Sequence, residues 1–306
     1  MKKQTITTAI ILFLCTSAWA QKEYKIAKSS GKLHLNLHGA IIEGYKGNEI
    51  IFTSQRAPEE EDERAKGLQA LSSSGYRDNT GLGINVTQNG QDIIVNMVGN
   101  RSVGDLLKIR VPEQLSLVFS NNQSVFADSL AIKNMKGEIE VSTSYNTVTL
   151  ENNSGPMSVK ALYRDVEARF GNDIKGPISI VSVYGHVDVA LPTAVKANLT
   201  LSTGYGKLYA ANDFDIAVSP PKHTATGTDD SSETATVEIE PRPTRRYTVA
   251  GVVPPAAPAA PEPARTITVN WLSHGGNKEN IEGTINGGGL DLILKSTYKN
   301  VYLRTK

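Results

Sequence analysis

The chain has 306 residues, which is enough for one elongated domain or two compact ones. Lysine and arginine number 32 and aspartate and glutamate 31, so the chain lacks the broad basic field of a protein whose main partner is nucleic acid. Its single cysteine excludes a disulfide scaffold and a thiolate metal site, and 21% charged with 6% aromatic residues indicates a chain that mostly folds.

The first twenty residues have the pattern of an export signal. Two lysines follow the initiator, an apolar run covers residues 9–15, and Ala18-Trp19-Ala20 places small residues where signal peptidase reads them. The apolar run is shorter than the roughly 20 residues that cross a bilayer. The sequence therefore predicts a signal peptide over residues 1–20, no transmembrane segment after cleavage, and a mature chain in the periplasm, on the outer-membrane surface or outside the cell.

Strand signals dominate the first half of the mature chain. Residues 32–38 alternate strictly between apolar and polar side chains, which is the period of a half-buried strand. Residues 56–80 differ, because an acidic run and a serine-rich stretch leave few apolar anchors and predict a solvated loop. Further strands are expected at residues 50–52, at 83–86 and 93–95 around an Asn89-Gly90 turn, and at 107–111 and 115–119 around a corner at Pro112.

From residue 136 the chain repeats with a period of about twenty residues. Each unit begins with a glycine, continues with alternating aliphatic residues and reaches a tyrosine eight residues later. Residues 198–205 extend the series, and a unit near the C-terminus has one extra residue in the interval. The pairs are Gly137 with Tyr145, Gly155 with Tyr163, Gly176 with Tyr184 and, at the C-terminus, Gly289 with Tyr298.

One unit of this length cannot bury its apolar face alone, so neighbouring units must stack. We therefore expect an all-β fold, a parallel β-solenoid of short two-strand rungs, β-helix-like, in which Ile139, Met157 and Ile178 point inward. The glycine at each unit start suits a sharp corner with positive φ. An antiparallel β-sandwich, which also uses short strands at even spacing, is the alternative.

A proline-rich stretch interrupts the repeats. Residues 219–265 are rich in proline, threonine and alanine, a composition typical of a flexible insertion with a semi-rigid part. Strand signals resume at residue 266. The predicted organisation is therefore a solenoid over residues 21–218, a disordered insertion over 219–265, and a C-terminal β repeat over 266–306 that completes the same domain.

Several of these motifs resemble the bacterial putative adhesin family, a family of secreted β-proteins of unknown function. The resemblance rests on the repeats, the Val189-Ala-Leu-Pro192 turn, the closing motifs at residues 285–289 and 298–304, and the segment Asp78–Gly83. It covers roughly residues 30–306 apart from the proline-rich insertion. The resemblance implies a β-helix-like fold and export from a bacterium of the Bacteroidetes type, and it supplies no catalytic residues.

The candidate metal ligands do not converge. His34, Asn36 and His38 share one face of the first strand, but residues four apart on a strand are separated by roughly 13 Å, too far to hold one ion. The acidic run over residues 59–63 lacks the spacing and central glycine of a calcium loop, and residues 277–280 are as loosely arranged. We expect no metal and no cofactor.

Some β-helices cleave polysaccharides, which requires acids and bases that converge on one face. Asp165 and Asp188 lie two and four residues after their tyrosines, so the repeat does not align them, and the chain has no G-x-S-x-G, H-E-x-x-H or P-loop motif. We expect no catalytic residues and a non-enzymatic protein. A polysaccharide lyase or hydrolase is one alternative, and a cell-envelope regulatory accessory protein is another. The other charged residues considered are Arg164, Glu167, Arg169 and Asp173.

The most regular feature is one tyrosine in each repeat, which a solenoid would stack as a ladder along one edge. One interpretation is structural, in which the rings pack on each other and seal a corner; the sequence favours it, because equivalent rung positions usually carry self-stacking residues. The other is a stripe that binds a surface glycan or another envelope protein, and exposure of successive rings would favour it. The ladder residues are Tyr145, Tyr163, Tyr184, Tyr205 and Tyr298.

Together these patterns predict an exported, non-enzymatic β-solenoid protein. Its expected role is that of an adhesin, or of a surface or periplasmic binding or scaffold module, because an extended solenoid presents long surfaces that suit polymers and proteins.

Overall fold

A computed structural model describes residues 22–54, 63–68, 75–98, 106–122, 128–220 and 279–306 in full, together with the backbone of residues 234–239 and 265–270. The predicted signal peptide lies outside the described residues, as do most of the predicted loop over 56–80 and most of the predicted insertion. The chain divides into two compact units, the first comprising Met1–Pro220 with Lys278–Lys306 and the second comprising Pro221–Asn277.

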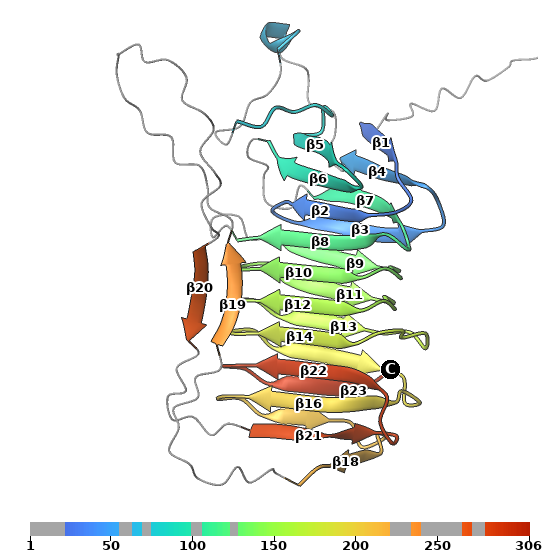
Figure 1. The fold of residues 1–306 in the computed structure, drawn as a ribbon, viewed down its shortest axis with the longest axis vertical. Coiled ribbons are helices and arrows are strands. Elements are labelled where there is room, and N and C mark those ends of the chain that lie inside the picture. Colours follow the sequence, from blue (N-terminus) through green and yellow to red (C-terminus); the bar gives the residue numbers. More distant parts are fainter. Residues whose placement is uncertain are drawn as a thin grey trace, which may run out of the picture. The chain divides into compact units, whose positions relative to one another are not determined.

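Two large sheets form the first unit, and their strands lie one above another in Figure 1. In spatial order, the first sheet contains β1 (Glu23–Ala27), β4 (Glu49–Ser54), β7 (Leu107–Pro112), β3 (Ala40–Tyr45), β9 (Ser129–Lys133), β11 (Thr147–Glu151), β13 (Val166–Arg169), β15 (Val187–Leu191), β23 (Val301–Thr305) and β17 (Leu208–Ala210). The second sheet contains β18 (Ile216–Val218), β21 (Glu279–Ile285), β16 (Ala197–Thr203), β22 (Leu290–Ser296), β14 (Ile178–Ser182), β12 (Met157–Ala161), β10 (Ile139–Thr143), β8 (Ser116–Asn121), β2 (Lys32–Asn36), β6 (Asp92–Met97) and β5 (Ile84–Asn89). A single turn of 3-10 helix, η1 (Glu63–Ala65), lies outside the sheets.

Each rung of the first unit is a strand of the second sheet followed by a strand of the first sheet. In the rungs β10–β11, β12–β13 and β14–β15, every strand pairs in parallel with its counterpart in the next rung. Ile139 lies opposite Met157, which lies opposite Ile178, and these residues are 0%, 4% and 1% exposed. The predicted parallel β-solenoid is confirmed, and the alternative of an antiparallel β-sandwich is wrong.

The glycine that begins each repeat has a different role from the one expected. Gly137, Gly155 and Gly176 do not have positive φ. A Cβ atom at Gly155 would lie 2.2 Å from the carbonyl oxygen of Gly137, and one at Gly137 would lie 2.3 Å from the carbonyl oxygen of Leu115. Glycine is therefore required because consecutive rungs approach too closely for a side chain at this corner, and the expectation of positive φ is wrong.

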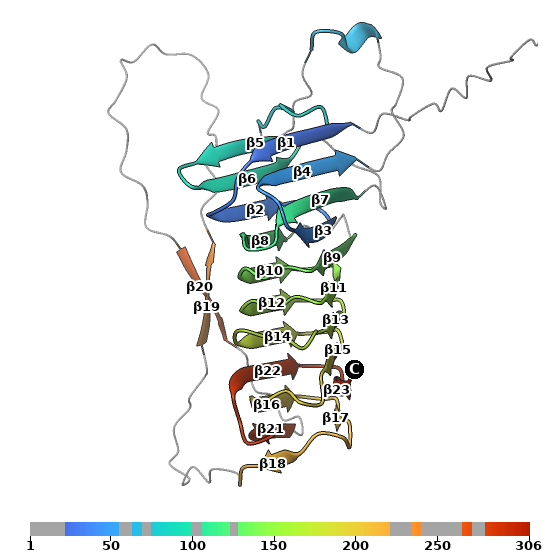
Figure 2. The ribbon, with the colours of Figure 1, turned by 90° about the vertical axis from the view of Figure 1, so that its right-hand side faces the viewer.

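The C-terminal rung β22–β23 lies in the interior of the stack. β22 pairs in parallel with β14 on one side and β16 on the other, and β23 pairs in parallel with β15 and β17. Figure 2 shows the red ribbon of this rung between two rungs that precede it in the sequence. The last repeat therefore stacks on two earlier repeats, and the spatial order of the rungs differs from their order along the chain.

The N-terminal rung β2–β3 is inserted in the same way. β2 pairs in parallel with β6 and β8, and β3 pairs in parallel with β7 and β9. Beyond these rungs the pairing becomes antiparallel, between β4 and β7, β1 and β4, and β5 and β6 at one end, and between β21 and both β16 and β18 at the other. Antiparallel strands thus cover both edges of the second sheet and one edge of the first, whereas β17 ends the first sheet in parallel pairing with β23.

A glycine-rich connector carries the chain from β21 past β16 to β22. Residues 286–289 are Asn-Gly-Gly-Gly, and the first three have positive φ. The Asn286 side-chain amide donates to the carbonyl of Thr193 at 2.9 Å, and a Cβ atom at Gly289 would lie 2.3 Å from the carbonyl oxygen of Lys196. This closing motif therefore forms the crossing that lets β21 and β22 flank the same strand, because side chains would collide with the backbone beneath it.

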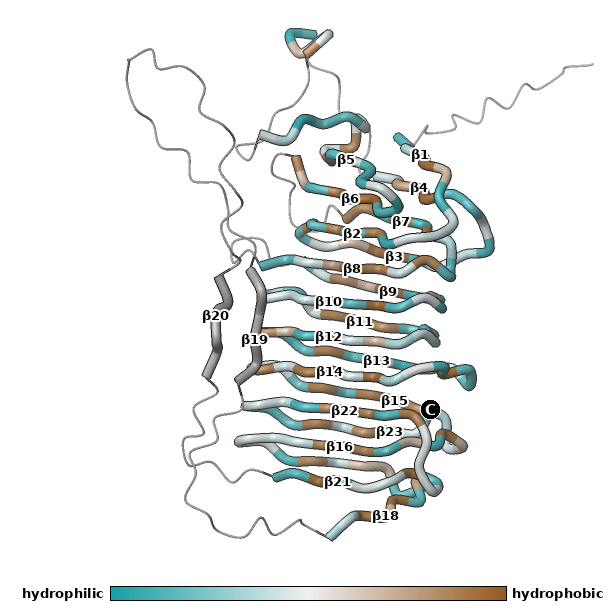
Figure 3. The backbone as a smooth tube through the Cα atoms, viewed as in Figure 1, coloured by the Kyte–Doolittle hydropathy of each residue, from teal (hydrophilic) through white to brown (hydrophobic). Residues whose placement is uncertain are grey.

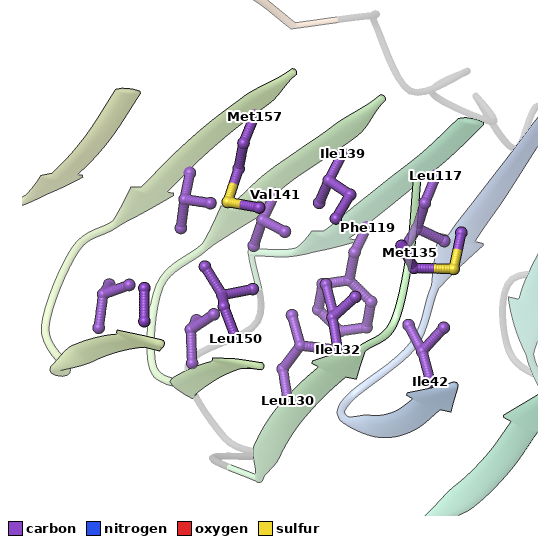
Figure 4. Close-up of a cluster of buried hydrophobic side chains, with 14 of the residues drawn as sticks. Ile42, Leu117, Phe119, Leu130, Ile132, Met135, Ile139, Val141, Leu150 and Met157 are labelled. Atoms are coloured by element: carbon purple, nitrogen blue, oxygen red, sulfur yellow. The ribbon is translucent and has the colours of Figure 1, made fainter. Parts of the chain in front are cut away.

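Apolar side chains fill the space between the two sheets. Figure 3 shows apolar and polar residues alternating along the strands, as expected for strands with one buried face. In Figure 4, Leu117, Ile139 and Met157 form one row from successive strands, and Phe119 and Val141 form the next. Burial of a side chain of this size stabilises a fold by about 1.5–3 kcal/mol, so each rung contributes to the core and depends on its neighbours.

In the second unit, β19 (Thr234–Ile239) and β20 (Arg265–Asn270) pair in an antiparallel arrangement. They fall within or next to the predicted insertion over 219–265, whose flexibility remains a prediction. Over the described part of the chain, the structure contains no helix long and apolar enough to cross a membrane.

Candidate binding surface

The repeat tyrosines occupy one corner of the solenoid, where the chain turns from the second sheet into the first. At this corner the backbone N–H groups of four of the five tyrosines, all but Tyr145, donate to a carbonyl of the adjacent rung. Tyr163 donates to Ser144 at 2.9 Å, and Tyr298 donates to Val183 at 2.9 Å. These bonds fix the tyrosine Cα atoms at equivalent positions in successive rungs, so the side chains leave the backbone in the same direction.

The five rings form one continuous stack, which we call the tyrosine ladder. The ring centroids are 4.5 Å apart for Tyr145 and Tyr163, 5.1 Å for Tyr163 and Tyr184, 4.7 Å for Tyr184 and Tyr298, and 5.0 Å for Tyr298 and Tyr205. The planes of neighbouring rings differ by 5–21°. The stacking expected from the repeat is present, and Tyr298 supplies the ring between Tyr184 and Tyr205.

A column of hydroxyl groups supports the ladder from inside. In the rungs of Tyr184, Tyr205 and Tyr298, the residue two positions before the tyrosine is a buried serine or threonine. Its hydroxyl accepts a hydrogen bond from an N–H three residues further on and donates to a carbonyl of the neighbouring rung. Ser296 accepts from Lys299 at 3.1 Å and donates to Gly185 at 2.8 Å. Ser182 and Thr203 make the same pair of bonds on the neighbouring rungs. These bonds satisfy the buried hydroxyl groups of the column and tie the corners of neighbouring rungs together.

The ladder is exposed as well as stacked. Tyr163, Tyr184, Tyr298 and Tyr205 are 42%, 42%, 44% and 55% exposed, and Tyr145 is half-buried. Stacking covers the flat faces of the rings with one another, so the ring edges and hydroxyl groups are the parts that meet solvent. Four successive exposed rings are the observation that favours a binding role over a purely structural one.

Close packing of the rings also changes their ionisation. Repulsion from Tyr298, together with loss of hydration, raises the pKa of Tyr184 above its ordinary value. Loss of hydration, with a smaller effect of Tyr163, raises the pKa of Tyr145 in the same direction. Tyr145 and Tyr184 therefore present neutral phenols, able both to donate and to accept hydrogen bonds, throughout the physiological pH range.

A second, shorter aromatic column was not foreseen from the sequence. Tyr209 stacks on Tyr302 with centroids 5.2 Å apart, and the ring of His186 lies 5.8 Å from that of Tyr302. Arg304 lies over Tyr302 and donates through Nε to both carboxylate oxygens of Asp188. The signal was available, because Tyr209 and Tyr302 each lie four residues after a ladder tyrosine.

The histidines considered as metal ligands do not gather. His34 lies in β2 and its Nε2 is 3.5 Å from Asp92, whereas His38 lies beyond the end of that strand. The Asn36 amide donates to Asn96 at 2.8 Å. Over the described ranges, no three histidine, cysteine, aspartate or glutamate residues are placed to hold a metal ion. Of the acidic run over 59–63, all but Glu63 lies outside the described residues.

The acidic residues considered for catalysis have separate structural partners. Asp188 is bonded to Arg304, Asp173 lies 3.0 Å from Lys175, and Asp165 accepts from the backbone N–H of His186 at 2.7 Å. Glu167 lies opposite Asp188 on the outer face of the first sheet. The register therefore makes neighbours of Glu167 and Asp188, whereas Asp165 precedes β13 and Asp173 follows it.

The comparisons with known proteins are sparse. No family model matches the chain, and no curated protein sequence matches it. Among solved structures, the crystal structure of a "putative cell adhesion protein" from Clostridium sporogenes is similar at a TM-score of 0.38 and 12% identity, covering 94% of this chain and 100% of that chain. A likeness at this level is too distant to assign a function, so the family resemblance seen in the sequence motifs remains a prediction.

Proposed function

We propose that this chain is an exported, non-enzymatic binding or scaffold module of a bacterial cell envelope, acting as an adhesin, and that the tyrosine ladder is its contact surface. The observation that carries the proposal is the row of exposed rings at equivalent positions on consecutive rungs. Tyrosine is well suited to such a surface, because it combines a large apolar body with a hydroxyl group and has few rotatable bonds to immobilise.

The rigidity of the ladder supports this role. Each ring is held between its neighbours, and the backbone beneath is held by rung-to-rung hydrogen bonds. A partner therefore does not have to order the surface when it binds, which removes part of the entropic cost of association. A repeated surface also suits a repetitive partner, because the same contact recurs on every rung.

Export and a non-enzymatic role are supported by the chain's own residues. The charged start, apolar run and Ala18-Trp19-Ala20 site have the order of a signal peptide, and the motifs at residues 285–289 and 298–304 resemble the bacterial putative adhesin family. Asp165 and Asp188, two of the acids close to the ladder, are engaged in structural hydrogen bonds. A glycan-active enzyme would instead need two acids facing one substrate bond.

Binding to cells tests the proposal. Fluorescently labelled mature chain is incubated with intact bacteria, and the bound fraction is compared between the wild type and the double variant Tyr163→Ser with Tyr184→Ser. We expect this variant to lose most of its binding. The matched control replaces two other exposed tyrosines, Tyr76→Ser with Tyr209→Ser, and should bind as the wild type does.

Two further readouts complete the test. Circular dichroism and thermal unfolding show whether the ladder variant retains the fold. Incubation of the wild type with bacterial and host polysaccharides, followed by measurement of new reducing ends and of unsaturated products, tests for cleavage. Equal binding by the ladder and control variants would refute the ladder as the contact surface, and release of products would favour a polysaccharide lyase or hydrolase.

A further inference from the structure

Positive charge is in excess at the positions that border the tyrosine ladder, which lie three residues before and one or two residues after each ladder tyrosine. On the side of the second sheet, Lys160 and Lys295 stand three residues before Tyr163 and Tyr298, at the same register position as Val181. On the side of the first sheet, three cations follow a ladder tyrosine by one or two residues. These cations are Arg164, Lys299 and Lys207.

These five cations are available to a ligand. All are exposed, and within the residues that the structure describes none of them forms an ion pair. The acidic residue at the bordering positions is Asp165, one of whose oxygens already accepts from the N–H of His186. By contrast, Lys133 on the outer face of the first sheet is paired with Glu151 at 2.7 Å. The field beside the ladder therefore favours an anion.

The parts of the rings that meet solvent indicate which class of anionic ligand can bind. Unstacked nucleobases bind to aromatic residues through the flat faces of the rings. In the ladder, the faces of Tyr163, Tyr184 and Tyr298 are covered by the rings on either side. What remains is a line of phenolic hydroxyls beside ammonium and guanidinium groups, which matches a ligand rich in hydroxyl and carboxylate oxygens.

The spacing of the ladder points to a polymer of sugars. Its rings repeat every 4.5–5.1 Å. An extended peptide advances by about 3.3 Å per residue and turns successive side chains to opposite faces, so its repeat does not match the spacing of the ladder rings. An extended chain of β-linked pyranose rings advances by close to one rung for each sugar. A carboxylated polysaccharide therefore matches the ladder in both charge and repeat.

We propose that the tyrosine ladder and its five flanking cations form a track for an acidic polysaccharide that runs along the stack, with about one sugar for each rung. The phenols bond the sugar hydroxyls, and the lysine and arginine side chains bond the carboxylates. This proposal rests on the proposed function, because it assigns a ligand class to the same surface. It adds a dependence on charge that a purely aromatic contact would not have.

Calorimetry with defined polymers tests the assignment. The full mature chain is titrated with polymannuronate, a β-1,4-linked polymer of carboxylated sugars, and with the same polymer after complete methyl esterification, which removes the negative charges. We expect binding of the charged polymer, a loss of affinity of about tenfold or more on esterification, and weakening as salt is raised, because exposed charges are screened. The double variant Lys160→Gln with Lys295→Gln should bind about fivefold more weakly.

The control variant removes the same charge elsewhere. Lys25 and Lys175 are exposed lysines away from the ladder, each paired with a neighbouring acid, and Lys25→Gln with Lys175→Gln should leave the affinity within about twofold. Equal affinity for the esterified polymer, or equal weakening by the control variant, overturns the proposal. Equally tight binding of a single-stranded oligonucleotide of the same charge also overturns it, because the track would then be a general polyanion surface.

Different experimental outcomes would overturn the acidic-polysaccharide proposal and the proposed function. If the wild type does not bind polymannuronate at low salt but binds cells through Tyr163 and Tyr184, the acidic-glycan assignment is overturned and the ladder remains the contact surface. If cell binding is also insensitive to the ladder variant, both proposals are overturned.

Discussion

Tyr184 stacks on Tyr298 with ring centroids 4.7 Å apart and planes 7° apart, although the whole of residues 185–297 separates them along the chain. Tyr298 in turn stacks on Tyr205 at 5.0 Å. Without the C-terminal rung, Tyr184 and Tyr205 would be two strand spacings apart, roughly 10 Å, and could not touch. The candidate binding surface is therefore continuous only when the C-terminal repeat occupies its place inside the stack.

The first prediction follows from the place of the C-terminal rung β22–β23 inside the stack. A chain that ends at Pro220 lacks β21, β22 and β23, so β14 and β16 lose the strand that pairs with both. We expect this truncated chain to aggregate or to unfold at a much lower temperature, because unpaired strand edges and the apolar faces of two rungs become exposed. Thermal unfolding and size-exclusion chromatography measure the effect.

Addition in trans provides the control for that truncation. A synthetic peptide of residues 279–306 should restore protection of the β14 and β16 amides against hydrogen exchange, since it supplies the missing rung. A truncated chain that unfolds as cooperatively as the full chain, without the peptide, would show that the inserted rung is not required.

The second prediction is that residues 221–278, which contain most of the proline-rich insertion, are dispensable for folding. β18 and β21 are antiparallel neighbours, and the N–H of Ser219 donates to the carbonyl of Glu282 at 2.7 Å. The ends that a short turn would have to join therefore already lie side by side. Replacement of residues 221–278 by a short Asn-Gly-containing turn should keep the unfolding temperature within a few degrees of the wild type. A large drop would mean that the removed residues stabilise the solenoid.

The regular part of this fold could be predicted because its sequence repeats. The interval from Gly137 to Tyr145 recurs in the next two units, and rungs with the same internal spacing must bury the same positions. The positions of Ile139, Met157 and Ile178 follow directly. A repeat shows which units share a shape, but it does not show which units are neighbours, so the place of the C-terminal rung could not be inferred.

Neither the place of the N-terminal rung in the stack nor the exposure of the ladder could be predicted from the sequence. Gly31 lies two residues before Leu33 of β2, as Gly137 does before Ile139, but no tyrosine follows it eight residues later. With half of the signature missing, the sequence did not indicate that β2–β3 would lie between β6–β7 and β8–β9. The stacking of the tyrosines followed from their regular spacing. Their exposure depends on the direction in which the corner projects, which is set by the hydroxyl column formed by Ser182, Ser296 and Thr203.

The third prediction tests the stacked core. Ile178 is buried between Met157 and Leu292, and its truncation to alanine should lower the free energy of unfolding by about 2–4 kcal/mol, because the rung cannot collapse onto the cavity. Ser179 is next in the same strand but faces outward, and Ser179→Ala should change it by less than about 0.5 kcal/mol. Denaturant titration measures both values, and equal effects would contradict an inward-facing Ile178.

The fourth prediction concerns the hydroxyl column. Ser296→Ala removes the acceptor for the N–H of Lys299 and the donor to the carbonyl of Gly185, and leaving such groups unsatisfied costs about 1–3 kcal/mol. We expect faster hydrogen exchange at the Lys299 amide and greater mobility of the Tyr298 ring. Ser179→Ala serves again as the control, since both variants remove one serine hydroxyl. Unchanged exchange at Lys299 would show that the column does not hold the corner.

The fifth prediction concerns pH. The pKa of Tyr184 is raised, first by repulsion from Tyr298, so in the folded chain this phenol keeps its proton at a pH where free tyrosine loses it. In the unfolded chain the same phenol ionises near the ordinary value of about 10. Between that value and the folded pKa the native state binds more protons than the unfolded state, so the free energy of unfolding falls as pH rises. The stabilisation is fully present below pH of about 10 and is lost as pH passes through the folded pKa.

Denaturant titrations between about pH 8 and pH 11, together with the absorbance of the phenolate, measure this loss. Tyr184→Phe keeps a ring of nearly the same shape between Tyr163 and Tyr298 but has no proton to lose. Its stability should therefore fall less steeply with pH than that of the wild type. Identical slopes for the two proteins would show that repulsion within the ladder does not cause the alkaline loss of stability.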